Sequence, residues 1–349
     1  MSQASRALAP VFNLDALASL MTAHGLGVTK ALQLEPLTGG QSNPAYRVHG
    51  ANLPLVLRKK PPGALLPSAH AVDREFRIMK ALRNTEVAVP EVYVYSNDVT
   101  ITGTPFYLMA YLDGRVFVDQ SLPGISRTER AAIYNEMNRV IAALHRIDPA
   151  TVGLSDYGRA GNYFARQIAR WTRQYQDSRL EDIKAMDALI AWLPERIPAD
   201  EQSTIVHGDY RLDNLVFDHV EPRIIGVLDW ELSTLGHPLA DFSYHCMSWR
   251  IPADLWRGIG GLNLKELGIP EETDYIRRYG EAAGALALEH WDFYMAYNLF
   301  RVAAILQGVA KRASDGNAAA ANATDMGRKA RPLAELGWTI AQGYDAAKK

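Results

Sequence analysis

Apolar positions near the start of the chain follow the spacing of one helix and then of several strands. Leu14, Leu17, Leu20 and Met21 share one face of a helix expected over 11–27. Short apolar or alternating runs predict strands at 34–37, 45–48, 53–60, 89–95 and 105–111, and a helical pattern over 70–82 interrupts them. The first third of the chain is therefore expected to be rich in strands.

The pattern becomes helical after residue 125. Ser126 and Glu129 form a capping box, and apolar positions at helical spacing follow from Ile133 to Leu144. Further helices are expected over 161–193, 291–312 and 326–347. The change from strands to helices falls within 106–114, so we expect two lobes, residues 1–110 and residues 111–349.

Composition excludes several classes of protein. The 349 residues are 48% hydrophobic and 22% charged, as in an ordinary globular protein. The net charge is −2 and the longest basic cluster is Arg58–Lys60, so no nucleic-acid-binding face is expected. Polar residues such as Glu289 and Arg301 interrupt the most apolar stretch, 282–310, which therefore predicts a buried helix and no membrane span.

Two further features concern location. Cys246 is the one cysteine, so no intrachain disulfide can form, which fits a reducing compartment. No apolar segment follows Met1–Arg6, so no signal peptide is expected and a cytoplasmic location is predicted. Nothing in the pattern indicates an oligomeric state.

The candidate chemistry lies in two polar loops that follow short apolar runs. Asp209 stands five residues before Asn214, and Asp229 ends the apolar run 224–228. One carboxylate can serve as a general base, and an amide and a second carboxylate can bind Mg²⁺, which keeps phosphate and water as its other ligands. Phosphoryl transfer needs these groups, because its catalysis is mostly positioning and charge neutralisation.

A single Asp or Asn in a loop is usually a turn or cap residue. Here the Asp-x4-Asn spacing and a strand-ending Asp 15 residues later match a kinase catalytic loop and metal site together. The sequence therefore predicts Asp209 as general base, Asn214 and Asp229 as metal ligands, and ATP and Mg²⁺ as cofactors.

His207–Asn214 and Leu228–Glu231 resemble the aminoglycoside phosphotransferase/choline kinase family of protein-kinase-like enzymes. More narrowly, Gly39–Asn43, Leu57–Pro62 and Asp73–Phe76 resemble the phosphotransferase module found alone in bacteria and fused to acyl-CoA dehydrogenases in animals. The resemblance covers most of the chain. It implies an α+β, bilobal protein-kinase-like fold, with a small antiparallel-sheet N-terminal lobe and a large, mostly helical C-terminal lobe.

The resemblance assigns nucleotide contacts to the N-terminal lobe. A glycine-rich hairpin would cover the ATP phosphates with Gly39, Gly40, Gln41, Ser42 and Asn43. The hairpin departs from the Gly-x-Gly-x-x-Gly of protein kinases, and an ordinary turn is the alternative. Arg58 stands where aminoglycoside kinases keep a phosphate-binding lysine, with Lys59 and Lys60 as alternatives, and Glu75 would be its ion-pair partner.

The resemblance also assigns roles around the C-terminal lobe. The backbone of Met109 and Tyr111 would bond the adenine edge, and Arg211 would face the moving phosphoryl group. Asp241 would brace the catalytic loop by accepting backbone hydrogen bonds. His207 is expected to be structural.

The expected acceptor is a hydroxyl group of a small molecule. Trp230-Glu231 replace Phe-Gly, and Leu232 with residues 233–240 is all that separates them from Asp241, too few residues for a protein-kinase activation segment. Arginines lie among aromatic residues in the expected acceptor region: Arg166, Arg170, Arg173, Arg250 and Arg301. They favour a neutral or anionic acceptor, such as a hydroxyacyl-CoA or a hydroxy acid, unless they face solvent. A catalytically silent nucleotide-binding module and a protein kinase remain the alternatives.

Overall fold

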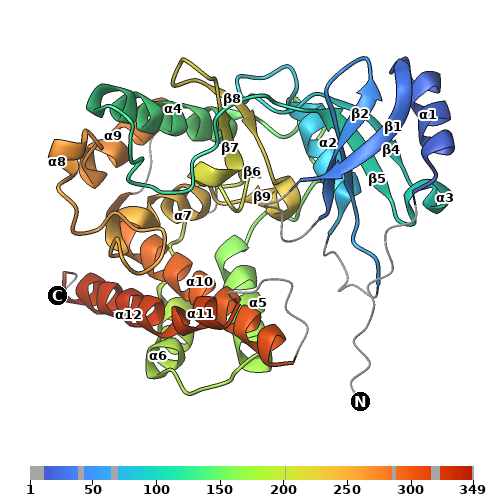
Figure 1. Cartoon of the computed structure of the whole chain (residues 1–349). Helices are drawn as coiled ribbons and strands as arrows, with labels where there is room; N and C mark the ends of the chain where they lie inside the picture. Colours follow the sequence, from blue (N-terminus) through green and yellow to red (C-terminus); the bar gives the residue numbers. More distant parts are fainter. Residues whose placement is uncertain are drawn as a thin grey trace. The chain divides into compact units, whose positions relative to one another are not determined.

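The structure, a computed structural model, describes residues 12–37, 43–63, 70–200, 202–284, 288–315 and 323–347 (Figure 1). The chain divides into two compact units. Unit 1 comprises Met1–Gly114 and Ile225–Glu231, and unit 2 comprises Arg115–Ile224 and Leu232–Lys349.

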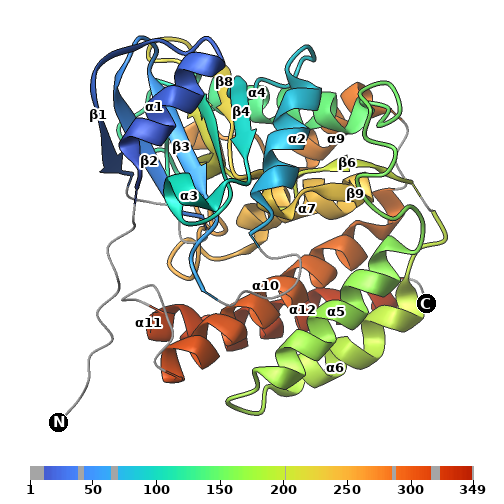
Figure 2. The same ribbon diagram turned by 90° about the vertical axis from the view of Figure 1, so that its right-hand side faces the viewer.

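Unit 1 is built on a five-stranded antiparallel sheet of order β1-β2-β3-β5-β4. The strands are β1 (Val28–Pro36), β2 (Ala45–Ala51), β3 (Leu55–Lys59), β4 (Val92–Ser96) and β5 (Phe106–Ala110). Its helices are α1 (Leu14–Ala23), α2 (Val72–Leu82) and α3 (Val99–Thr102). Figure 2 shows α1 and α3 lying over one face of the sheet.

Alternation along β3 separates the core from the polar face. Leu55 and Leu57 are fully buried in one apolar cluster with Met21 of α1 and Ile101 of α3. Because successive side chains of a strand point to opposite faces, Arg58 projects away from that cluster. The burial of Leu55 and Leu57 in the core therefore places Arg58 on the opposite face of the sheet.

Residues 225–231 return to unit 1 through the end of β8 (Ile224–Val227). The Val227 amide donates to the Ala88 carbonyl at 2.8 Å. Asp229 then takes a left-handed conformation, with φ of 63°. The Trp230 indole is buried and donates to the Val227 carbonyl at 2.9 Å, which fixes the turn that carries Asp229.

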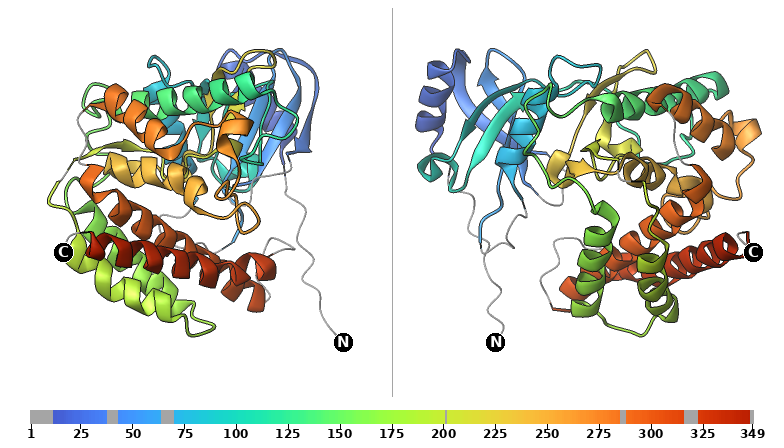
Figure 3. Two further views of the ribbon diagram at one scale, coloured as in Figure 1. Left: turned by 90° about the vertical axis from the view of Figure 1, so that its left-hand side faces the viewer. Right: turned by 180° about the vertical axis from the view of Figure 1, so that it is seen from behind.

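Unit 2 is mostly helical. Its helices are α4 (Arg127–Arg146), α5 (Tyr163–Asp177), α6 (Lys184–Trp192), α7 (Pro238–Arg250), α8 (Leu264–Leu267), α9 (Glu272–Ala283), α10 (Trp291–Ser314), α11 (Ala323–Arg328) and α12 (Ala330–Ala346). Its short strands are β6 (Thr204–Val206), β7 (Leu215–Phe217) and β9 (Thr234–Gly236), and β6 pairs antiparallel with β9. Helix α10 packs on α5, α7 and α12, and Figure 3 shows α12 in red alongside α10 in orange.

Local sequence explains how the long helices begin and why they are buried. The Ser126 hydroxyl accepts a hydrogen bond from the Glu129 amide, as the capping pattern predicted. Helix α10 is buried on all sides between Phe293 and Ala304, as expected for a core helix. In the part of the chain that the structure describes, we find no helix with the length and apolar character of a membrane span.

Most predicted elements are present with shifted ends. The helix expected over 161–193 is two helices, α5 and α6, and the last helix is divided into α11 and α12. Helix α3 was not predicted. The sheet of unit 1 and the helices of unit 2 agree with the predicted α+β class.

His237 caps the start of α7 in an unusual state. Its Nδ1 accepts a hydrogen bond from the Leu239 amide at 3.2 Å, so the proton of the neutral ring lies on Nε2. Nε2 is buried without a hydrogen-bond partner among the described residues, and the nearest carboxylate, Asp200, lies 3.8 Å away. Burial lowers the pKa of His237 from 6.5 to about 4.

We expect this histidine to make unit 2 sensitive to acid. Because its pKa is lower in the folded than in the unfolded protein, the unfolded chain takes up the proton first as the pH falls below 6.5. The free energy of unfolding should therefore lose about 2 kcal/mol between pH 7 and pH 5 through His237. In His237→Asn, which keeps a capping acceptor without titrating, that loss should be absent.

Urea denaturation of the wild type and His237→Asn at pH 7 and pH 5 measures this difference. The exposed His24 provides the matched control, since His24→Asn should keep the wild-type pH dependence. Equal pH dependence of the wild type and His237→Asn would contradict the assignment.

Candidate active site

Unit 1 gathers a buried ion-pair cluster around Arg58. Its guanidinium Nε lies 2.8 Å from Glu75 Oε2, and its NH2 donates to Asp229 Oδ1 at 2.6 Å. Glu75 is 1% exposed, and it also accepts hydrogen bonds from the Tyr107 hydroxyl at 3.0 Å and the Asn43 amide at 2.5 Å. Both oxygens of the buried carboxylate are therefore satisfied, as a buried charge requires.

The electrostatics of this cluster keep Arg58 charged. Burial disfavours the guanidinium charge, but the carboxylates of Glu75 and Asp229 outweigh that effect and raise the pKa of Arg58. A planar guanidinium held on two sides presents its remaining N–H groups in a fixed direction. Such a group suits the recognition of phosphate oxygens.

The three adjacent cations occupy different environments. Lys59 is buried on the opposite face of β3, where its ammonium bonds the Thr102 carbonyl and lies 5.0 Å from the centre of the Phe12 ring. Lys60 is partly exposed after the end of the strand. Arg58 is the cation that the structure joins to Glu75.

The other predicted nucleotide contacts have mixed placements. Gly39, Gly40, Gln41 and Ser42 lie outside the described residues. Asn43 is fully buried, and its side chain bonds both Glu75 and the His70 ring, so it holds the carboxylate in place from within the unit.

The segment expected to meet adenine lies at the end of β5. Met109 pairs with Val56 of β3, and the Tyr111 amide already donates to the Pro54 carbonyl at 2.9 Å. A contact from Tyr111 to adenine would therefore use its carbonyl oxygen.

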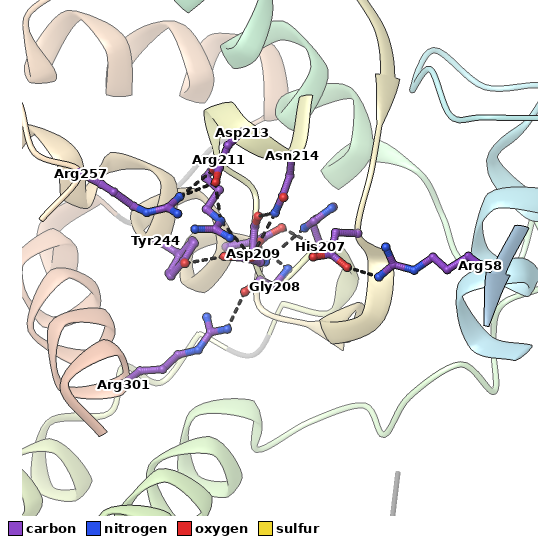
Figure 4. Close-up of polar contacts among 12 residues, drawn as sticks. Arg58, His207, Gly208, Asp209, Arg211, Asp213, Asn214, Tyr244, Arg257 and Arg301 are labelled. Atoms are coloured by element: carbon purple, nitrogen blue, oxygen red, sulfur yellow. Dashed lines mark hydrogen bonds and ion pairs between the residues drawn. The ribbon is translucent and has the colours of Figure 1, made fainter. Parts of the chain in front are cut away.

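Asp209 is the centre of the polar cluster in unit 2 (Figure 4). Its Oδ2 accepts hydrogen bonds from Arg211 Nε at 3.0 Å and Asn214 Nδ2 at 3.1 Å. Its Oδ1 accepts one from the Tyr244 hydroxyl at 2.5 Å. Three of the predicted site residues, Asp209, Arg211 and Asn214, are thus in direct contact with one another.

The loop that carries Asp209 is fixed through its backbone. The amides of His207 and Gly208 donate to the buried Asp241 carboxylate at 2.7 and 2.8 Å. Gly208 has a φ of 83°, and a Cβ there would lie 2.7 Å from the Leu232 carbonyl, so only glycine fits. The predicted bracing role of Asp241 is confirmed.

A histidine supports the brace in turn. Burial opposes the charge of Asp241 most strongly, but hydrogen bonds and charge from His145 and His207 outweigh it and lower the pKa of Asp241. His145 Nε2 lies 3.2 Å from Asp241 Oδ2, and its Nδ1 lies 2.5 Å from the Tyr279 hydroxyl. His145 therefore has a structural role, linking Asp241 to Tyr279.

Sequence reasoning missed several groups around Asp209. Arg257 NH1 donates to both oxygens of Asp213 at 2.7 Å, and Arg211 Nε lies 3.4 Å from the same carboxylate. Tyr244 lies three residues after Asp241 on α7, so the two share one helix face. That spacing was a usable signal for Tyr244, whereas no local pattern pointed to the pair of Asp213 and Arg257.

The predicted metal ligands offer the donors that Mg²⁺ prefers. The amide nitrogen of Asn214 donates to the Asp209 carbonyl at 2.8 Å, so the amide oxygen would be its metal-binding atom. Asp229 uses Oδ1 for Arg58, so Oδ2 would be the metal donor. Within the described ranges no group of three or more His, Cys, Asp or Glu side chains is arranged to hold a metal ion.

Comparison with known proteins identifies the family. A model of the phosphotransferase enzyme family matches residues 33–297. The chain belongs to this family. It is 46% identical over 337 residues to acyl-CoA dehydrogenase family member 10 of Mus musculus, which covers 95% of this chain and 31% of that protein. The chain thus spans less than half the length of the curated relatives it matches.

Solved structures of family members confirm the fold. A protein from Ralstonia eutropha, provisionally described as an aminoglycoside phosphotransferase, is 49% identical, with a TM-score of 0.87 over 95% of this chain and 99% of that one. A thermostable mutant of aminoglycoside phosphotransferase APH(4)-Ia, in complex with AMP-PNP and hygromycin B, is 18% identical, with a TM-score of 0.59 over 93% and 98%. The predicted family and the bilobal kinase-like fold are confirmed.

Because Arg58 is paired with the buried Glu75, its substitution should destabilise the protein far more than substitution of the neighbouring Lys60. Arg58→Met leaves Glu75 buried without its partner and should lower the free energy of unfolding by about 3 kcal/mol or more. Lys60→Met removes a partly exposed cation and should cost about 0.5 kcal/mol or less. Adding Glu75→Gln to Arg58→Met should recover part of the loss, because it removes the unpaired charge.

Urea denaturation of the three variants at neutral pH measures these differences. A larger loss in Lys60→Met than in Arg58→Met would show that the wrong cation has been paired with Glu75.

Proposed function

We propose that this protein is an ATP- and Mg²⁺-dependent phosphotransferase that phosphorylates a hydroxyl group of a small molecule. The observation that carries the proposal is the Asp209 carboxylate, held by Arg211 and Asn214 in a loop that Asp241 braces. A carboxylate fixed in this way can accept or orient the proton of an acceptor hydroxyl. Residues 1–110 would supply the nucleotide contacts, and residues 111–349 the catalytic loop and acceptor site.

The remaining predicted residues fit defined roles in this reaction. Arg58, positioned by Glu75, would bind the ATP phosphates, and Arg211 would stabilise charge on the transferred phosphoryl group. Asn214 and Asp229 would hold Mg²⁺, which neutralises phosphate charge when bound. The glycine-rich segment from Gly39 would cover the phosphates. The complex of APH(4)-Ia with AMP-PNP supports the use of a nucleotide.

A small pocket beside the catalytic loop indicates the chemistry of the acceptor. It is lined by uncharged and basic side chains and by no carboxylate: Gln120, Arg211, Tyr244, His245, Met247, Ser248, Ile251, Trp256 and Arg257. The Trp256 indole N–H is buried there and has no hydrogen-bond partner among the described residues. A pocket that offers hydrogen-bond donors and no carboxylate suits a neutral or anionic substrate better than a polycation.

The arginines expected in the acceptor region do not carry this argument, because Arg301 bonds the Gly208 carbonyl and Arg173 is exposed. Arg166 bonds backbone carbonyls of residues 159–161, Arg250 pairs with Glu272, and Arg170 stacks on Trp171. The case for a non-cationic acceptor therefore rests on the lining of the small pocket, which includes no carboxylate; its two arginines, Arg211 and Arg257, also bond Asp209 and Asp213. Together with the relatives' acyl-CoA dehydrogenase names, it favours a hydroxyacyl-CoA or a hydroxy acid as acceptor.

Substitution of the proposed metal ligand Asp229 should weaken ATP binding, whereas substitution of the proposed base Asp209 should lower kcat. Asp229→Asn should weaken Mg²⁺-dependent ATP binding about tenfold or more, because a metal ligand and a partner of Arg58 are both altered. Asp209→Asn should leave ATP affinity within about twofold and lower kcat by at least 100-fold, because the proton acceptor is lost while the proposed nucleotide-binding residues remain. Calorimetric titration of ATP with Mg²⁺, and steady-state kinetics, distinguish the two. Unchanged ATP binding in Asp229→Asn would reverse the assignment.

The acceptor class is tested by direct comparison. Steady-state kinetics with a kanamycin-type aminoglycoside, choline, a hydroxy acid and a hydroxyacyl-CoA should show turnover of at least one acyl compound. The two cations should be poor acceptors, because the pocket lacks the carboxylates that would attract them. Efficient phosphorylation of the aminoglycoside with none of the acyl compounds would show the charge argument to be wrong.

A further inference from the structure

Tyr244 of α7 engages the proposed catalytic base directly. Its hydroxyl donates to Asp209 Oδ1 at 2.5 Å, whereas Arg211 and Asn214 both bind Oδ2. The carboxylate is therefore held from both oxygens (Figure 4). A carboxylate oxygen can accept two hydrogen bonds. Oδ1 of Asp209 can therefore still accept one from the hydroxyl group of the substrate, in addition to the one from Tyr244.

Arg301 of α10 fixes both Tyr244 and the loop. Its guanidinium lies 4.9 Å from the centre of the Tyr244 ring, and its NH2 donates to the Gly208 carbonyl at 2.5 Å. The same guanidinium lies 5.6 Å from the Trp171 ring. Since Arg301 is 6% exposed and Tyr244 is 8% exposed, neither side chain can swing into solvent without opening the packing.

The Tyr244 hydroxyl keeps its proton and Arg301 keeps its charge. Burial raises the pKa of Tyr244 most, and the nearby Asp209 carboxylate adds to it, so the phenol keeps its proton. Burial opposes the charge of Arg301, but Tyr297, Tyr163, Tyr244 and Asp209 outweigh it and raise its pKa. The tyrosine thus stays a donor, and the arginine stays charged.

We propose that Tyr244 and Arg301 are positioning residues that hold the Asp209 carboxylate in the orientation needed for proton transfer from the acceptor. Tyr244 acts on the carboxylate, and Arg301 acts on the Tyr244 ring and on the Gly208 carbonyl next to the base. The inference rests on the proposed function, because it assigns Asp209 as the base. Small displacements of a catalytic group lower kcat, whereas substrate affinity comes from other contacts.

Kinetics of Tyr244→Phe test the first contact. Loss of a hydrogen bond to a charged group should lower kcat about 10- to 100-fold, with KM for ATP and acceptor within about twofold. Tyr344→Phe is the matched control, because it removes another phenol in contact with a side chain, the His290 ring at 2.7 Å, from the distant helix α12. Its kcat should stay within twofold of the wild type.

A double-mutant cycle tests whether the two residues act as a unit. Arg301→Lys keeps the charge but not the planar group, and it should also lower kcat. Tyr244→Phe with Arg301→Lys should then cost little more than the larger single loss. Unchanged kcat in Tyr244→Phe, or fully additive losses, would overturn the proposal.

Amide hydrogen exchange tests the inference without any turnover. Exchange of the peptide that spans His207–Arg211 should be faster in Tyr244→Phe and Arg301→Lys and unchanged in Tyr344→Phe. If Arg301→Lys does not fold, Tyr244→Phe alone decides. Wild-type exchange in both variants would overturn the proposal. Failure of the wild type to phosphorylate any acceptor would count against the proposed function, and the exchange result would still decide the role of these residues.

Discussion

The buried carboxylate of Asp241 is the interaction on which the arrangement of unit 2 depends. It binds two consecutive loop amides, those of His207 and Gly208, and it contacts His145 of α4. Asn298 of α10 donates to the Ala240 carbonyl one residue earlier, so α4, α7 and α10 meet at one short stretch of chain. Loss of this carboxylate would leave two buried amides without partners, which costs more than the bonds themselves. The loop that carries Asp209 is thus held by the packing of three helices.

Unit 1 contains a second buried carboxylate, that of Glu75. A charge without partners would be too costly to bury, and Glu75 is bound by Arg58, Tyr107 and Asn43. These contacts tie helix α2 to strands β3 and β5, and they leave Arg58 in one orientation. In each unit, one fully satisfied buried carboxylate fixes a functional group that is itself only partly buried: Asp209 in unit 2 and Arg58 in unit 1.

The sequence predicted the features that depend on local periodicity and on motif spacing. The resemblance selected Arg58 from three adjacent cations, and the structure pairs it with Glu75; the spacing from Asp209 to Asn214 identified two groups in contact. Helix α7 was not placed, because twelve of its thirteen residues are buried and no amphipathic stripe marks it. Arg301 reaches Gly208 from 93 residues away, and such a contact depends on packing that no local pattern describes. Asn43 was expected at the phosphates from its place in the motif, whereas its bond to Glu75 appears only once α2 is in position.

Asp229 shows how conformation and charge can be separated at a single position. Its φ of 63° is in the left-handed region, which costs an ordinary residue about 1 kcal/mol or more but is tolerated by Asp and Asn. The buried Trp230 indole holds the turn through the Val227 carbonyl, and the conformation presents the carboxylate to Arg58. Strain of this kind persists where surrounding contacts over-determine the backbone, and it is common at functional sites. Asparagine fits the same backbone and volume without the charge. The effect of replacing Asp229 by Asn therefore reports on the carboxylate, whereas replacement by Ala would combine it with backbone strain.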